Sequence, residues 1–389
     1  MPSVIVSACR TPIGAFLGAL SPLTAPELGA AVLREALVRA GLAGETLDAV
    51  IMGNVLSAGV GQAPARQAAL KADIPNAVGA LTVNRACGSG LQAVLLADQA
   101  IRAGDARAIL AGGMESMSNA PFLLPKARTG LRMGHAELLD AMLVDGLLDP
   151  DDGSHMGITG ELCAREQKIS RKRGDAWAAA SYRRALAAQA EGAFERELTS
   201  VTVPAPKGTL APVSADEIPR PTTAETLAGL RPAFDPAGTI TAGSSSKVAD
   251  GAAAVCVLEE QEAERLGKPV LARIVAGATH SREPERLMMA PETAIRRCLE
   301  RAGWDHADLY EINEPFAAAT VALTEALQLD PEQVNVHGGA VALGHPIGAT
   351  GCRLLVTLLY ALERHGLRRG VAALCLGGGE ALALAVERP

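Results

Sequence analysis

The chain has 389 residues, enough for two or three domains and a large core. Hydrophobic residues make up 49% of the sequence but aromatic residues only 3%, which is typical of an α/β protein packed from Ala, Val, Leu and Ile. A net charge of -7 gives no general attraction to nucleic acid or to an anionic membrane, so we expect neither as a partner.

The seven cysteines are scattered and include no Cys-x-x-Cys pair, which argues against a disulfide framework and against a metal site. A reducing compartment fits this pattern better. Residues 1–6 begin as a strand without a basic leader, and no apolar run approaches about 18 residues. We therefore expect a soluble, cytoplasmic protein.

The first elements alternate between strand and helix. Residues 4–6 predict a buried strand, and Thr24 with Glu27 predicts a capping box for a helix that ends at Gly41. A strand at 49–52, a helix near 65–72, a strand at 80–83, a helix from Cys87 to about Gly104 and a strand at 108–111 follow. This alternation favours a parallel sheet with helices on both faces.

Residues 119–240 interrupt the alternation with turns, proline-rich connections and one long helix at about 170–190, and look like an insertion. Strands then return at 252–257 and near Val270. Residues 308–314 resemble 48–54, and residues 374–380 resemble 109–115. We infer a duplicated α/β unit whose halves bring strand ends to one shared cleft.

Cys87 lies where a strand meets a helix, between Ala86 and the small residues Gly88, Ser89 and Gly90. The positive field of a helix N-terminus favours a thiolate, and small neighbours leave room for a substrate. The alternative is a buried cysteine that packs as a small hydrophobe.

Three further residues follow strand ends or precede helices in the second half. Asn313 is either a site residue or a turn residue. His345 is held between Gly344 and Pro346, and Cys375 precedes a run of glycines beginning at Gly377 whose amides can face an anion. One thiol that attacks an acyl carbon, with a second that moves a proton on carbon, would suit bond formation between two acyl groups.

The motifs NRACGSG (84–90), GGMESMS (112–118), NEPFA (313–317), GHPIG (344–348) and CLGGG (375–379) together resemble the signatures of the thiolase family. The resemblance extends in order over almost the whole chain. It implies an α/β fold of duplicated βαβαβαββ halves in a layered αβαβα core with an inserted loop domain. The implied divisions are residues 1–118 with 241–267, the insertion 119–240, and 268–389.

The resemblance also implies the chemistry, which is a reversible Claisen condensation of two acetyl-CoA molecules to acetoacetyl-CoA and CoA. Cys87 would be the acylated nucleophile, His345 its activator and Cys375 the acid/base on carbon. Asn313 would hold a water that forms one oxyanion hole with His345, and the amides of Cys87 and Gly377 would form the other. The resemblance further implies that the chain assembles as a homo-oligomer, either a dimer or a tetramer.

No tightly bound cofactor is implied, because coenzyme A thioesters are the substrates. By resemblance, CoA would lie along the insertion near Arg220, Ser246, His155 and Met156, and the segment HMG at 155–157 resembles the short-chain biosynthetic branch. Arg220 as a simple surface charge is the alternative.

The sequence departs from the family pattern at several positions. Ser244 stands where Asn is common, Lys247 where a small or apolar residue is usual, and Pro315 where Ala is common. Residues 287–290 replace a glycine-rich segment beside the acyl pocket, which leaves chain-length preference open. Glu380 is close enough to Cys375 in sequence to raise the pKa of that thiol.

Rival functions fit parts of the sequence. Residues 88–93 match a loose dinucleotide motif with Glu115 as a possible ribose ligand, which would indicate a nicotinamide enzyme. A ketosynthase would carry a histidine where Asn313 stands, and a cysteine hydrolase would leave Cys375 unused. A 3-ketoacyl-CoA thiolase for longer chains and a silent acyl-CoA-binding protein remain alternatives.

Overall fold

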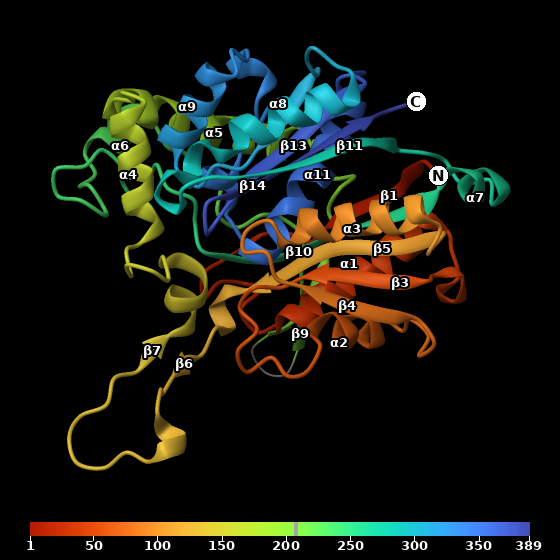
Figure 1. Cartoon of the computed structure of the whole chain (residues 1–389), viewed down its shortest axis with the longest axis horizontal. Helices are drawn as coiled ribbons and strands as arrows, with labels where there is room; N and C mark the ends of the chain where they lie inside the picture. The colour runs from red at the N-terminus through yellow and green to blue at the C-terminus, as the bar shows by residue number, and fades with distance from the viewer. Residues whose placement is uncertain (206–208) are drawn as a thin grey trace.

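The computed structural model describes residues 1–205 and 209–389. Its main feature is a ten-stranded sheet, with helices packed on both faces (Figure 1). The strands are β1 (Ser3–Arg10), β2 (Gly14–Ala15), β3 (Ala49–Gly53), β4 (Gly79–Val83), β5 (Ala108–Ser116), β10 (Ala249–Glu259), β11 (Ala272–Ser281), β12 (Leu309–Ile312), β13 (Arg369–Leu376) and β14 (Glu380–Glu387).

The helices lie between these strands or in the segment between β5 and β10. They are α1 (Ala25–Ala40), α2 (Pro64–Lys71), α3 (Ser89–Ala103), α4 (Met156–Glu166), α5 (Arg171–Ala190), α6 (Ala224–Ala228), α7 (Glu260–Arg265), α8 (Ala290–Ala302), α9 (Ala317–Ala326), α10 (Ala340–Leu343) and α11 (Ile347–Arg364).

The strand directions differ from the parallel sheet that the alternation favoured. The strand order is β12-β13-β14-β11-β1-β10-β5-β3-β4, and only β3–β4, β3–β5 and β12–β13 are parallel pairs among the described strands. The prediction was wrong for β1, β10, β11 and β14. Strands such as β1 and β10 are buried throughout. A continuous apolar run of this kind does not indicate whether a strand pairs in parallel or antiparallel with its neighbours.

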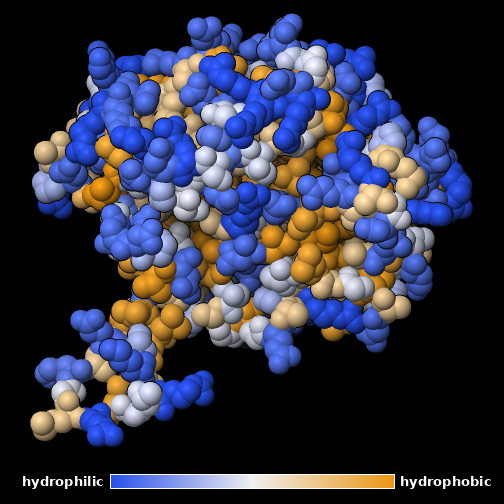
Figure 2. Space-filling model, viewed as in Figure 1, coloured by the Kyte–Doolittle hydropathy of each residue, from blue (hydrophilic) through white to orange (hydrophobic). Residues whose placement is uncertain are grey.

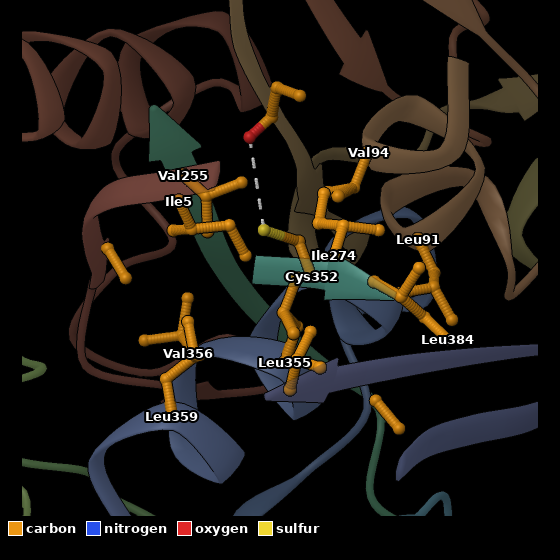
Figure 3. Packing of buried hydrophobic residues seen from close by; sticks show 14 of the residues in the cluster. Ile5, Leu91, Val94, Val255, Ile274, Cys352, Leu355, Val356, Leu359 and Leu384 are labelled. Carbon is orange, nitrogen blue, oxygen red and sulfur yellow. Dashed lines mark hydrogen bonds between the residues drawn. The ribbon is translucent and has the colours of Figure 1, made fainter. Parts of the chain in front are cut away.

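The sheet folds into two halves, since β1 and β11 share only the pairs Val4–Arg273 and Ile5–Ala272. Helices α3 and α11 lie between the two halves, with α1 and α2 outside one and α8 and α9 outside the other (Figure 1). Figure 3 shows part of the central cluster, in which Cys352 and Leu355 of α11 pack near Ile274 of β11. The layered αβαβα arrangement is thus confirmed.

Local signals in the sequence located most elements well. Thr24 and Glu27 form the predicted capping box at the start of α1, and Gly41 ends the helix in the left-handed conformation with φ 58°. The helix predicted at about 170–190 is α5, whose N-cap residue Ser170 accepts a hydrogen bond from the amide of Arg173.

The segment between β5 and β10 contains two small hairpins that the sequence did not predict. Strands β8 (Val201–Ala205) and β9 (Thr209–Val213) pair with each other, and Val201 and Val203 pack on the outer core beside α1. Strands β6 (Phe122–Leu123) and β7 (Leu139–Asp140) form the base of an arm, residues 122–140, which extends from the body of the molecule (Figure 1).

Candidate active site

The residues predicted to react all line one cavity of about 430 Å³. Cys87 comes from the first half of the chain, and Asn313, His345, Cys375 and Gly377 come from the second. The duplicated halves therefore bring these side chains together, as the sequence predicted.

Cys87 lies in a tight loop between the end of β4 at Val83 and the start of α3 at Ser89. Ala86 adopts a left-handed conformation with φ 43°, which is strained for a residue other than glycine. The Ser89 hydroxyl accepts a hydrogen bond from the Arg85 amide at 2.8 Å and donates one to the Ala86 carbonyl at 2.7 Å. These bonds stabilise the strained turn and fix the direction of Cys87.

The expectation that the helix start favours a thiolate at Cys87 is only partly met. Burial raises the pKa of Cys87 to about 11, although its own amide and that of Gly377 donate hydrogen bonds to sulfur and lower it. Burial outweighs the amides because a charged sulfur loses its water shell there. Cys87 therefore needs a base to remove its proton.

His345 lines the same cavity as Cys87, and its ring has a nitrogen that can accept a proton. Its Nδ1 atom lies 2.7 Å from the Thr350 hydroxyl, which in turn donates to the Pro346 carbonyl at 3.0 Å. Because the hydroxyl proton is used on Pro346, the hydroxyl accepts from Nδ1–H, which leaves the lone pair on Nε2. Burial, with a smaller effect of Arg353, lowers the pKa of His345 to about 3, so the imidazole is neutral at physiological pH.

Asn313 presents an unpaired carboxamide to the cavity. Its side chain is 2% exposed, yet neither Oδ1 nor Nδ2 has a hydrogen-bond partner among the described residues. A buried amide without partners costs free energy, so it is a group that a ligand or water can satisfy. Its neighbour Glu314 is fully buried and accepts bonds from Trp177, Ser181, Asn335 and the Val341 amide.

Cys375 is the last residue but one of β13, and Leu376 leads into the turn formed by Gly377, Gly378 and Gly379. Gly378 and Gly379 both have φ 86°, which favours glycine. Burial raises the pKa of Cys375, and the nearby Cys87 raises it further. Glu380, which we expected to raise it, instead forms an ion pair with Arg85 at 2.9 Å, and its charge is not among the causes.

Comparison with known proteins identifies the family. Residues 3–261 match the model of the thiolase N-terminal domain, and residues 268–388 match the thiolase C-terminal domain. This chain belongs to the thiolase family.

Its similar relatives match over nearly the full length of both chains. An acetyl-CoA acetyltransferase of Pseudomonas aeruginosa is 51% identical over 388 residues, which cover 99% of each chain. One of Cupriavidus necator is 50% identical, again over 99% of each. A cytosolic acetyl-CoA acetyltransferase of Mus musculus is 48% identical over 392 residues, covering all of this chain and 98% of the relative.

The residues expected to contact CoA divide into two groups. His155, Met156 and Ser246 line the same cavity as the reactive residues, and the His155 ring stacks on Phe234 with centroids 4.8 Å apart. Arg220 is exposed and is not part of the cavity lining. Burial lowers the pKa of Lys247, and the charge of Arg220 lowers it further.

Several departures from the thiolase pattern line the cavity, namely Lys247, Pro315, Leu287 and Met288, whereas Ser244 and Glu380 do not. The ammonium of Lys247 donates to the carbonyls of Ala242 and Ser245 at 2.6 and 2.5 Å, so it is bound within the protein rather than surrounded by solvent. Leu287 and Met288 line the cavity where a glycine-rich segment is usual.

Glu115 has a role in this thiolase that sequence reasoning missed. Its carboxylate is fully buried and accepts hydrogen bonds from the amides of Val55, Leu56 and Gly348. It therefore joins the first half to the start of α11, beside His345, and cannot bind a ribose as the dinucleotide alternative required. The sequence shows Glu115 within the GGMES motif, but it could not reveal the hydrogen-bond partners because they lie up to 233 positions away in the chain.

Neither a metal-binding cluster of side chains nor a membrane-spanning helix is found among the described residues. Within residues 1–205 and 209–389, no group of three or more His, Cys, Asp or Glu side chains is arranged to hold a metal ion. In the same part of the chain, no helix combines the length and hydrophobicity needed to cross a bilayer.

Proposed function

We propose that this thiolase condenses two molecules of acetyl-CoA to acetoacetyl-CoA and CoA, and catalyses the reverse thiolysis. The observation that carries the proposal is the meeting of two cysteines, a neutral histidine and an unpaired asparagine amide in one cavity. The printed names of the relatives, which are about half identical over the full length, point the same way.

The first half-reaction transfers the acetyl group to Cys87. Nε2 of His345 accepts the thiol proton, and the Cys87 sulfur attacks the acetyl carbonyl carbon of acetyl-CoA. The carbon–sulfur bond to CoA then breaks, and the imidazolium returns its proton to the departing CoA thiolate. The amides of Cys87 and Gly377 stabilise the negative oxygen of the tetrahedral intermediate.

The second half-reaction forms the carbon–carbon bond. The neutral imidazole of His345 takes the proton of the Cys375 thiol, and the Cys375 thiolate then takes a proton from the methyl group of a second acetyl-CoA. The resulting carbanion attacks the acetyl carbon on Cys87, and the Cys87–carbon bond breaks. The imidazolium gives its proton to the Cys87 thiolate, which leaves both cysteines as thiols and His345 neutral, as at the start. A buried thiol with a raised pKa suits this step, because its thiolate is a strong base.

The proposed oxyanion site of this second step is formed by His345 and a water held by Asn313. The unpaired Asn313 amide supports this role because it can both donate to and accept from a water. CoA would extend from the sulfur past Ser246, His155 and Met156, with Arg220 at the outer end.

The test is mass spectrometry of the protein after mixing with acetyl-CoA. A hydroxylamine-sensitive acetyl adduct on Cys87, followed by formation of acetoacetyl-CoA, supports the proposal. Specific acyl-CoA binding without an adduct would instead favour a silent binding protein. A higher kcat/KM for a longer 3-ketoacyl-CoA than for acetoacetyl-CoA would favour the degradative alternative.

The domain division is part of the same proposal. Residues 1–118 with 241–267 would form the first thiolase half, residues 119–240 the inserted CoA-binding and assembly domain, and residues 268–389 the second half. The proposed location is the cytoplasm, to which the name of the mouse relative lends support.

We also propose that the protein works as a homo-oligomer, and two surfaces support this. Strand β4 pairs only with β3 among the described strands, and its Leu81 side chain is 52% exposed. The arm carries the exposed side chains of Phe122, Leu131 and Met133, and hydrophobic residues gather along its base (Figure 2). Light scattering of the intact protein should give the mass of a dimer or tetramer, and Leu81→Lys should lower it.

A further inference from the structure

The loop that carries Cys87 is joined by an ion pair to the hairpin that carries Cys375 and Gly377. Arg85 Nε lies 2.9 Å from Glu380 Oε2, and Arg85 Nη2 lies 3.1 Å from Glu380 Oε1. Two parallel bonds of this kind fix the orientation of both groups as well as their distance. The residues are 295 positions apart, so the pair connects the two halves of the chain.

The surrounding contacts orient both partners. Arg85 also donates to the Gln92 side-chain oxygen at 2.6 Å, and the Ser281 hydroxyl donates to Glu380 at 3.3 Å. The Arg85 side chain keeps the pKa of Glu380 below its usual range, so the carboxylate is charged at neutral pH. Glu380 faces Leu376 across the hairpin, and the turn between them contains Gly377.

Packing in the same place shows how closely the loop and the hairpin approach. A Cβ atom added to Gly88 would lie 2.4 Å from the Leu376 side chain, and one added to Gly377 would lie 3.8 Å from Cβ of Ala86. The side chains of Ser89 and Asn84 form the hydrogen bonds that stabilise the strained turn at Ala86, and both residues belong to the loop itself. Among the side-chain hydrogen bonds of the described residues 84–89, those that reach the hairpin are the bond from the Gly377 amide to the Cys87 sulfur and the two from Arg85 to Glu380.

We propose that Arg85 and Glu380 are a positioning pair, which holds the Cys87 sulfur against the Gly377 amide and opposite Cys375. The inference rests on the function proposed above and adds two residues to it. Neither side chain lines the cavity, so the pair acts through the loop and the hairpin rather than on the substrate. An ion pair that is 26% and 33% exposed contributes little to folding, so its loss should be seen in the chemistry rather than in stability.

The test compares Glu380→Gln and Arg85→Gln with a matched control. Arg369 and Glu387 form an ion pair at 3.2 Å at the other end of the same hairpin, with 45% and 26% exposure. In the first two variants we expect kcat for condensation to fall about 10-fold while KM for acetyl-CoA changes less than about 2-fold, because a misplacement near 1 Å can cost about 100-fold in rate. Glu387→Gln should keep the wild-type kcat.

A charge swap tests whether a lower kcat comes from the lost Arg85–Glu380 ion pair or from a general disturbance of the fold. The double variant Arg85→Glu with Glu380→Arg restores opposite charges across the same gap, so its kcat should return to within about 3-fold of wild type. The proposal is overturned if either single variant keeps the wild-type kcat, or if kcat falls as far in Glu387→Gln as in the single variants. It is also overturned if the double variant has a kcat no higher than the single variants while all of them melt at the wild-type temperature.

A second measurement does not depend on the substrate. The Gly377 amide helps to lower the pKa of Cys87, so a loosened contact should slow alkylation of Cys87 by iodoacetamide at pH 8 by about 3-fold. Slower alkylation in a protein that makes no acetoacetyl-CoA would reject the proposed function and keep the positioning pair. Unchanged alkylation and kcat in an active condensing enzyme would reject the pair and keep the function.

Discussion

The imidazole of His345 is held by Thr350, whose hydroxyl lies 2.7 Å from Nδ1. Both residues are buried at the start of α11, and the Thr350 hydroxyl is itself fixed by the Pro346 carbonyl. The sequence predicted His345 but not this partner, which determines the nitrogen that carries the proton.

Thr350→Val should therefore lower kcat about 10- to 100-fold with little change in KM. General-base catalysis contributes about 10²–10⁴-fold, and this variant removes the orientation of the base but not the base. Thr350→Ser should keep most of the activity because it keeps the hydroxyl. Thr357→Val, buried further along the same helix, is the control, and steady-state kinetics that show equal losses for the two valine variants would contradict the role of Thr350.

Cys375→Ser should separate the two half-reactions. Acetyl transfer to Cys87 should persist at a similar rate, whereas formation of acetoacetyl-CoA should fall at least about 100-fold, because a serine hydroxyl is a much weaker acid than a thiol. Mass spectrometry of the adduct and product analysis measure the two steps. Cys163→Ser, in the same apolar cluster, is the control, and near-normal condensation by the Cys375→Ser variant would refute the division of roles.

The pH dependence of Cys87 reactivity should reflect its raised pKa. Since burial raises that pKa to about 11, the fraction of thiolate increases about tenfold for each pH unit up to about pH 10. Alkylation by iodoacetamide in the absence of substrate should rise in this way. A plateau already at pH 8 would contradict the raised pKa of Cys87. His345, with a pKa lowered to about 3, should add no step between pH 5 and 8, and such a step would contradict its assignment.

Gly113→Ala should destabilise the protein and reduce activity together. An added Cβ would lie 2.1 Å from the Gly348 carbonyl oxygen at the start of α11, so the helix that follows His345 must move. We expect a loss of about 1–3 kcal/mol in the free energy of unfolding, measured in urea. Gly229→Ala, where the nearest atom would be 3.6 Å away, should change stability by less than about 1 kcal/mol.

Local sequence signals predicted much of the fold because their physical causes are local. The cap at Thr24 and Glu27, the stop at Gly41 and the turn before α3 depend on residues within a few positions of each other. Strand direction could not be predicted in this way. Strand β10, for example, is buried at every position, so its sequence does not indicate which strands it pairs with or in which direction.

The candidate site was predictable where the family motifs carry reactive side chains. Cys87, Asn313, His345 and Cys375 all reach the cavity, whereas Arg220, inferred from the family pattern alone, does not. The supporting contacts were not predictable because they join distant segments: Glu115 binds Gly348, Glu314 binds Trp177, and Arg85 binds Glu380.

The central layer has a consequence for attempts to divide the molecule. Helix α3 and helix α11 come from opposite sides of residues 262–267, and their apolar faces share one cluster between the two sheets. A gene split at that point would encode two fragments, each with an uncovered sheet face prone to aggregation when made alone. Produced together, the fragments would form a complementation pair, and recovered condensation activity would show that they associate inside a living cell.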